Sequence, residues 1–391
     1  MFGSRNRIFC LFLASCCLCG AALAKSTSTE VVGYVFPKDA ALQPGQIDPT
    51  RLTRINYAFA NISNGRLVAG FAKDPENFAT LTALRKQNPR LKVLVSAGGW
   101  LGSTNFSDMA LTPQSRKTFI DSAMDFLDRY DLDGLDVDWE YPGMEGTGHP
   151  FRPEDNQNFT ALLRELRARF NLKTAKTRRR LYLTIAAGAS AEYLQHTEMN
   201  KVQSYVDSVN LMTYDFANPA SDPATGHNAP LYTNPDAPNQ VSANDAVRAF
   251  RNAGVPAAKI YLGIPFYGRV WAEVADRNHG LFQPGKPAAE GWATYQVVAT
   301  TMLDEGHGFA RYWDAKASVP WLFNAKKHIF VTYEDRESIT AKCNFARAHK
   351  LGGVMFWEYA NDPSGTLLGA IHKALLTDSS TRKASRSNAD R

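Results

Sequence analysis

Cysteine is nearly absent from the body of this chain. Four of the five cysteines lie within the first 24 residues, and only Cys343 follows them. A single cysteine cannot form an internal disulfide, so the folded body has to be stabilised by its hydrophobic core. Cys343 falls in a predicted helix, Asp335–Lys350. We expect it there as a small buried apolar side chain and not as a catalytic thiol.

The chain also lacks a strong charge imbalance, with 44 Lys and Arg against 38 Asp and Glu. Without a basic stripe, nothing supports nucleic acid as a partner. Metal and cofactor motifs are missing as well. The eight histidines are scattered, with no His-Glu-x-x-His or Cys/His cluster. We therefore expect no metal, no cofactor and no obligate protein partner, and we take a monomer as the default state.

The first 24 residues read as an export signal. Arg5 and Arg7 precede an uncharged apolar run, and Ala22-Leu23-Ala24 matches a signal-peptidase site. The apolar run is shorter than the roughly 20 residues of a membrane span. We predict a signal peptide over residues 1–24 and a secreted protein. The alternative is a lipoprotein anchored through Cys16, and the first residue of the mature protein, Lys25 or Cys16, distinguishes the two.

Apolar β-type runs alternate with amphipathic helical stretches through residues 25–376, and this rhythm predicts a parallel sheet. The helical stretches are Pro75–Asn88, Pro113–Tyr130, Pro153–Phe170, Ala191–Val206 and Ala243–Ala253. The β-type runs are Val31–Pro37, Arg54–Ala60, Lys92–Trp100, Gly134–Pro142, Leu181–Gly188, Ser208–Phe216, Lys259–Arg269 and Gly352–Tyr359. Eight β/α units predict a closed (β/α)8 TIM barrel. A doubly wound open sheet is the alternative, but no Gly-rich phosphate loop follows the first strand.

One gap interrupts the alternation between predicted strands 7 and 8. It contains the short β-type pieces Ala293–Val298, Phe309–Trp313 and His328–Tyr333. We interpret residues 270–334 as a small α+β insertion domain that forms one wall of a groove. Residues 377–391 are polar and charged with almost nothing apolar, so we predict a disordered tail.

Three acidic residues lie at alternate positions of the fourth predicted strand. Asp136, Asp138 and Glu140 share one face, because side chains of a strand alternate. The intervening Leu135, Val137 and Trp139 suit the face that meets the helices. The acids therefore point along the barrel axis, where ordinary barrels place branched apolar residues. Like charges so close cannot all ionise, so we expect a retained proton and predict acid catalysis by Glu140 at the mouth.

A second catalytic carboxylate is hard to find. A retaining glycosidase normally uses a nucleophilic carboxylate about 5 Å from the acid. Only Asp215 stands at the end of another predicted strand. This scarcity favours the exception in which the 2-acetamido group of the substrate acts as the nucleophile.

The acidic strand also carries a family resemblance. Asp133–Pro142 resembles the D-x-x-D-x-D-W-E signature of glycoside hydrolase family 18, the chitinases and their relatives. Lys92–Trp100 is similar to the S-x-G-G strand of that family, and Met212–Asp215 to its M-x-Y-D strand. Tyr267–Arg269 resembles the end of strand 7 before the insertion that one large subgroup carries, and Gly353–Trp357 resembles strand 8. These matches follow the expected order and span nearly the whole body of the chain.

The resemblance implies a chitinase that works by substrate-assisted catalysis. Glu140 would protonate the glycosidic oxygen, and Asp138 would bind the acetamido N–H and steer its carbonyl oxygen onto C1. Asp136 would share the proton with Asp138. Tyr214 would bond the acetamido oxygen, and Asp215 would support the distorted sugar. Water would then open the oxazolinium intermediate with retention.

The resemblance also implies a set of substrate-binding positions. Trp357 would form the floor under the reactive sugar, Trp100 would stack on the leaving-group side, and Ser96 would bond Asp136. The full set is Tyr34, Phe59, Ser96, Gly98, Gly99, Trp100, Tyr141, Met212, Tyr267, Arg269 and Trp357. We expect chitin or chito-oligosaccharides as the partner.

Other functions on the same barrel stay open at this point. A non-catalytic chitin-binding lectin would be expected to lack the acid at Glu140, which this chain keeps. An endo-β-N-acetylglucosaminidase or a peptidoglycan hydrolase would keep the chemistry and change the substrate. The long insertion favours a deep groove and a chitin chain.

Overall fold

A computed structural model describes residues 29–375 of the chain. Eight parallel strands form its central sheet, and β1 pairs with both β14 and β2, which closes the sheet into a barrel. The predicted (β/α)8 barrel is therefore confirmed. In chain order the barrel strands are β1 (Glu30–Val35), β2 (Arg54–Ser63), β4 (Lys92–Gly98), β5 (Gly134–Asp138), β6 (Tyr182–Gly188), β7 (Ser208–Met212), β8 (Ile260–Pro265) and β14 (Gly353–Trp357).

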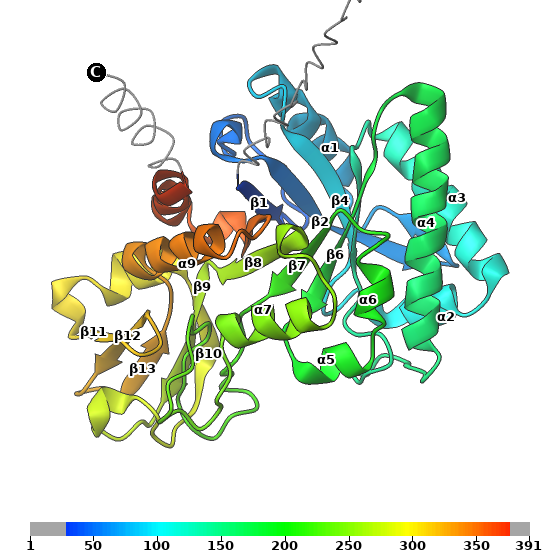
Figure 1. Ribbon diagram of the computed structural model, residues 1–391. Coiled ribbons are helices and arrows are strands. Elements are labelled where there is room, and N and C mark those ends of the chain that lie inside the picture. Colours follow the sequence, from blue (N-terminus) through cyan, green and yellow to red (C-terminus); the bar gives the residue numbers. More distant parts are fainter. Residues whose placement is uncertain (1–28, 376–391) are drawn as a thin grey trace, which may run out of the picture.

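Helices surround the barrel, as Figure 1 shows for α1, α3 and α4. A capping box between Thr112 and Ser115 satisfies free backbone groups at the start of α3. The helices are α1 (Asp74–Ala83), α2 (Phe106–Ala110), α3 (Pro113–Arg129), α4 (Asp155–Thr177), α5 (Ala191–Gln195), α6 (Met199–Val202), α7 (Ala243–Asn252), α8 (Tyr295–Val297) and α9 (Arg336–Ala348). Residues 366–375 are also helical.

The main core lies between the barrel and this layer of helices. Leu135 and Val137 of β5 belong to one buried cluster with Phe119 of α3 and Leu162 of α4. Cys343 of α9 lies in the same cluster, and burial raises the pKa of its thiol to about 12. The expectation of a buried, unreactive cysteine is therefore confirmed.

A second sheet lies beside the barrel and is drawn in yellow and orange at the lower left of Figure 1. Its core contains Trp271, Trp321 and Phe330, so Trp271 is a packing residue of the insertion. The strand order is β10-β9-β13-β12-β11, with antiparallel pairing throughout. The strands are β9 (Tyr267–Ala272), β10 (Lys286–Thr294), β11 (Ala310–Asp314), β12 (Val319–Asn324) and β13 (Ile329–Thr332).

The predicted strand Lys259–Arg269 is wrong as a single element. Barrel strand β8 ends at Pro265, which has no backbone N–H to continue a ladder. The N–H of Phe266 still bonds the carbonyl oxygen of Trp357, and β9 then begins at Tyr267 in the second sheet. The chain therefore leaves the barrel between β7 and β14 and carries Tyr267 and Arg269 onto the wall of the insertion.

Several other predicted boundaries also need correction. The predicted helix Ala191–Val206 divides into α5 and α6, because Glu198 leaves the helical region with φ −88° and ψ 62°. The predicted β-type piece Ala293–Val298 ends at Thr294, whose side chain accepts from the N–H of Val297 and starts α8. Strands β5 and β7 end four residues earlier than predicted. The short strand β3 (Arg66–Val68), β12 and α2 were not predicted.

The predicted signal peptide, including Cys16, and the predicted tail over residues 377–391 lie outside the described residues. Within residues 29–375, no helix is both long enough and apolar enough to cross a membrane.

Candidate active site

Strand β5 places its acidic residues inside the barrel. Asp136 is fully buried, Asp138 is 4% exposed, and Glu140, two residues beyond the end of the strand, is 9% exposed. The opposite face meets the helices, where the ring of Trp139 stacks on Phe106 of α2 with centroids 5.2 Å apart. The alternation predicted from the sequence is therefore confirmed. It produces a column of three carboxyl groups, those of Asp136, Asp138 and Glu140, that rises to the open end of the barrel. We call these three residues the acidic column.

Asp136 lies at the base of this column, surrounded by hydrogen-bond donors. Its Oδ2 accepts from the hydroxyl of Tyr34 at 2.8 Å and from that of Ser96 at 2.9 Å. Its Oδ1 accepts from the side-chain amide of Asn210 at 3.0 Å and from the hydroxyl of Thr184. Tyr34 and Ser96 therefore lie below the open part of the site and contact the acid from there.

Asp138 lies in the middle of the column. Burial raises the pKa of its carboxyl group well above the ordinary range, and the neighbouring charges of Glu140 and Asp136 raise it further. These surroundings therefore favour the protonated form of Asp138. Its Oδ1 has no hydrogen-bond partner within the described residues, so the carboxyl group keeps one unused acceptor.

Glu140 lies at the mouth with a pKa suited to acid catalysis. Burial raises the pKa of its carboxyl group to about 7, with a further contribution from the charge of Asp215, while a hydrogen bond from Tyr141 acts in the opposite direction. The backbone N–H of Glu140 donates to the hydroxyl of Ser103 at 2.9 Å, which fixes the main chain at this residue. A glutamic acid with such a pKa can donate a proton near neutral pH.

Asp215 lies on the far side of the site, beyond the end of β7. Its Oδ1 accepts from the hydroxyl of Tyr267 at 2.9 Å and from Nε and Nη2 of Arg269 at 2.8 and 2.5 Å. The backbone N–H of Asp215 donates to Oδ1 of Asn228 at 2.9 Å, which holds the residue at a φ of +60°. An arginine that donates twice to a carboxylate neutralises it and makes it a poor nucleophile.

Aromatic rings form the floor of the site. The indole of Trp357 stacks on Phe59 with centroids 5.5 Å apart and lies 5.7 Å from the ring of Tyr34. Met212 and Tyr214 of the β7 segment pack on the same buried cluster as Trp357. The structure therefore brings together the predicted aromatic positions of strands 1, 2, 6 and 8.

The sequence-predicted tryptophan of strand 3 projects from the rim. Trp100 is 48% exposed, and its ring centroid lies 6.3 Å from that of Tyr141. The hydroxyl of Thr147 donates to its carbonyl oxygen at 2.7 Å, so the loop after β5 fixes this rim. An exposed, supported indole can stack on the face of a sugar ring.

Two glycines allow β4 to approach the acidic strand closely. Gly98 and Gly99 have φ values of +111° and +80°, which side chains rarely permit. A Cβ at Gly98 would meet the carbonyl oxygen of Asp138, and one at Gly99 would meet the ring of Phe59. These predicted substrate-binding positions therefore also have a packing role at the site.

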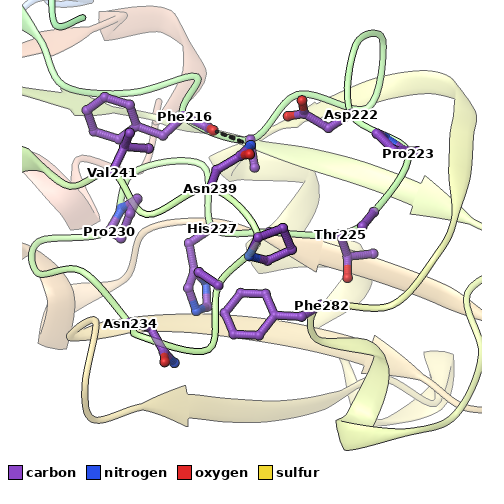
Figure 2. Close-up of a pocket in the computed structure, with 15 residues that line it drawn as sticks. Phe216, Asp222, Pro223, Thr225, His227, Pro230, Asn234, Asn239, Val241 and Phe282 are labelled. Atoms are coloured by element: carbon purple, nitrogen blue, oxygen red, sulfur yellow. Dashed lines mark hydrogen bonds between the residues drawn. The ribbon is translucent and has the colours of Figure 1, made fainter. Parts of the chain in front are cut away.

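A separate cavity of about 170 Å³ adjoins the site beyond Asp215. Figure 2 shows His227 and Phe282 side by side in its lining, with ring centroids 5.8 Å apart, and none of the predicted site residues lines it. Burial opposes ionisation of Asp314 nearby. Hydrogen bonds from His227 and Asn234 nevertheless lower its pKa to about 2, and burial lowers the pKa of His227. His227 is therefore neutral and anchors the loop that carries Asn228.

Several residues that build the site were not predicted: Arg54, Ser103, Thr184, Asn210 and Asn228. Asn210 shares the inward face of its strand with Met212 and Tyr214. The alternation of side chains along this strand could therefore have predicted that Asn210 points into the barrel. Ser103 lies in a single 3-10 turn and Asn228 in a loop, and neither segment has a periodic pattern that could have predicted them. No group of His, Cys, Asp or Glu in residues 29–375 has an arrangement that could hold a metal ion.

Comparison with known proteins gives a consistent match. The sequence model of the glycosyl hydrolases family 18 matches residues 30–362. Chitinase A1 of Niallia circulans is 37% identical, over 91% of this chain and 60% of its own length. This chain therefore spans about three fifths of that relative.

Solved structures agree with the sequence match. Chitinase ChiA74 from Bacillus thuringiensis superposes with a TM-score of 0.84 and 33% identity, over 90% of this chain and 70% of that one. A glycoside hydrolase family 18 N-acetylglucosaminidase from Paenibacillus barengoltzii superposes with a TM-score of 0.81 and 37% identity, over 88% of this chain and 99% of that one.

Proposed function

The chain belongs to family 18 of the glycosyl hydrolases, and from this membership we propose that it is a chitinase. Its substrates would be polymers and oligomers of β-1,4-linked N-acetylglucosamine, cleaved with retention of configuration at C1. One observation carries the proposal: the buried Asp138, whose pKa is raised, lies below Glu140 on the inward face of the β5 segment, and the pKa of Glu140 is about 7.

The first step of the proposed reaction breaks the glycosidic bond. Glu140 donates its proton to the glycosidic oxygen while the acetamido carbonyl oxygen of the same sugar forms a bond to C1. Asp138 accepts a hydrogen bond from the acetamido N–H through its unused oxygen, and this bond holds the acetamido carbonyl oxygen below C1. Tyr214 bonds the acetamido oxygen and holds it below C1.

The second step opens the oxazolinium intermediate. Water attacks C1 from the face that the leaving group vacated, and Glu140 takes a proton from this water as general base. The C1–acetamido bond breaks and the acetamide is restored. Two inversions at C1 give net retention.

The state of Asp215 supports the acetamido group as nucleophile. Its carboxylate is bonded by Arg269 and Tyr267, so it supports the distorted sugar and does not attack C1. The floor made by Trp357 and the rim residue Trp100 suit a chain of sugar rings, which present apolar faces.

Substrate chemistry gives the first test of this proposal. N-acetyl-chitotetraose is expected to be cleaved, whereas cellotetraose should be inert because glucose lacks the 2-acetamido nucleophile. Chromatography of both digests under identical conditions measures this difference. Appreciable release of cellobiose would show that a protein carboxylate performs the attack, and would sink the substrate-assisted mechanism.

The pH dependence gives a second test. The proposed acid must be protonated in the free enzyme, so activity is present below its pKa and lost as the pH rises through it. Because the pKa of Glu140 is about 7, kcat/KM for chitotetraose is expected to fall tenfold per pH unit above about pH 7. A profile that stays flat to pH 9 would contradict the assignment of Glu140 as the acid.

The product pattern separates chitinase action from a related activity. One structurally similar protein is an N-acetylglucosaminidase. A chitinase should release mainly the disaccharide from chitotetraose, whereas an exo-acting N-acetylglucosaminidase should release the monosaccharide first. Binding without cleavage would instead indicate a lectin, which the presence of Glu140 and Asp138 argues against.

A further inference from the structure

A second polar cluster fills the barrel below the acidic column. Its centre is Arg54 of β2, which is 3% exposed and forms no ion pair with a carboxylate in residues 29–375. Its Nη2 donates to the hydroxyl of Ser208 and to Oδ1 of Asn210, both at 3.0 Å. Its guanidinium lies 5.0 Å above the ring of Tyr261 on β8. A buried, unpaired cation is costly, so its position calls for a reason.

The hydrogen bonds of this cluster have a fixed direction. An arginine can only donate, so the oxygen of the Asn210 amide faces Arg54 and its NH2 group faces away. That NH2 donates to Oδ1 of Asp136 at 3.0 Å and to the hydroxyl of Tyr34 at 2.9 Å. Because the Tyr34 hydroxyl accepts from Asn210, its own proton points to Oδ2 of Asp136 at 2.8 Å.

This direction decides where the proton of the acidic column resides. With the amide and the Tyr34 proton both pointing at Asp136, its carboxylate is held as an acceptor on both oxygens. The hydroxyls of Ser96 and Thr184 fill the remaining acceptor positions. A proton on Asp136 would displace one of these donors. If Arg54 were absent, the Asn210 amide could turn and present its oxygen to a protonated Asp136.

We propose that Arg54 is a positioning residue that acts through Asn210 to keep Asp136 ionised and the shared proton on Asp138. This inference rests on the proposed function, in which Asp138 and Glu140 use that proton at the substrate. In this proposal Asp136 provides the fixed negative charge, and the proton stays on Asp138, the next residue toward the mouth of the barrel.

The surroundings of Asp136 contain few other ionisable groups. The other ionisable groups of the β5 segment that face it are Asp138 and Glu140. Tyr34 from β1 and Tyr214 from the β7 segment face it with neutral hydroxyls, since burial raises the pKa of both. Arg54, stacked on Tyr261, is the cation on this side of the column. Its removal therefore frees the oxygen of the Asn210 amide, through which Arg54 acts on Asp136.

The test replaces the cation with an apolar side chain of similar length. In Arg54→Met, kcat for chitotetraose is expected to fall about tenfold or more, because a shift of one pKa unit moves a proton population tenfold. KM should stay within about threefold, since Arg54 lies below the substrate floor. The acidic limb of the kcat/KM profile should move to higher pH, because the Asn210 amide is then free to turn its oxygen toward Asp136.

Two further variants separate positioning from simple loss of stability. Arg54→Lys keeps a cation that can donate to Asn210, so the acidic limb should return toward its wild-type position even where the melting temperature stays lowered. Arg116→Met removes another buried arginine, which bonds Glu165 between α3 and α4. It should lower the melting temperature and leave the acidic limb unchanged.

The possible outcomes distinguish this inference from the proposed function. Wild-type protein that fails to cleave chitotetraose overturns the proposed function. Active wild type together with an Arg54→Met variant whose acidic limb has not moved overturns the role of Arg54 alone. If Arg54→Met does not fold, Asn210→Asp takes its place. That variant still accepts from Arg54 but cannot donate to Asp136, so an unmoved acidic limb there also overturns the proposal.

Discussion

Replacing Glu140 with glutamine is expected to lower kcat on chito-oligosaccharides on the order of 10³-fold or more. Glutamine keeps the size of the side chain and its place beside Tyr141, but it has no acidic proton for the glycosidic oxygen and cannot act as a base toward water. Both chemical steps therefore lose their proton transfer. Time courses with N-acetyl-chitotetraose at pH 6 measure the loss.

The same substitution should leave the fold and much of the binding intact. The contact from the backbone of Glu140 to Ser103 does not involve the carboxyl group and stays in place. Glu145 is an exposed glutamic acid five residues further along the chain, so Glu145→Gln is a matched control that should retain full activity. Activity of Glu140→Gln within tenfold of the wild type would place the acid elsewhere.

Replacing Asp138 with asparagine is expected to lower kcat by about 10²-fold to 10³-fold while KM changes little. The buried carboxyl group carries the proton of the column between Asp136 and Glu140 and orients the acetamido group for attack on C1. Asparagine fits the same space and presents an oxygen, but it has no carboxyl proton to place between these two acids. The loss therefore falls on the transition state and not on substrate binding.

The control for this variant is an aspartic acid outside the column. Asp276 is exposed on the insertion, and Asp276→Asn should leave kcat and KM unchanged. Steady-state kinetics of the two variants over pH 4 to 9 provide the comparison. An Asp138→Asn enzyme with a wild-type kcat would show that the column carries no catalytic proton.

The acidic column could be predicted from the sequence because its signal is local. Three acids at alternate positions of one strand define a face without any knowledge of the neighbouring strands, and the apolar residues between them define the opposite face. The number of β/α units likewise predicted the closed barrel. Each of these conclusions depends on a period of two or on a count along the chain.

The cluster below the column could not be predicted in this way. Arg54, Thr184 and Asn210 stand on three different strands and meet only when the barrel closes. In the sequence, Arg54 is a single charge at the start of an apolar run, and its inward direction becomes visible only in three dimensions. The contacts that set the protonation of Asp136 are long-range, and no single segment records them.

The division of the predicted seventh strand has a similar origin. Between its charged ends, Lys259–Arg269 is apolar, aromatic or small throughout, so its pattern favoured one strand. The change of direction after Pro265 depends on the bond from Phe266 to Trp357 and on the second sheet that receives Tyr267. Tyr267 and Arg269 thereby reach Asp215 from the insertion wall.

The most direct test of the account follows the anomeric configuration of the first product. N-acetyl-chitotetraose is mixed with the enzyme, and proton NMR spectra are recorded before mutarotation is complete. The account predicts that the new reducing ends appear first as the β-anomer and that the disaccharide is the main product. Initial release of the α-anomer would contradict it, because inversion requires direct attack by water and excludes the acetamido intermediate.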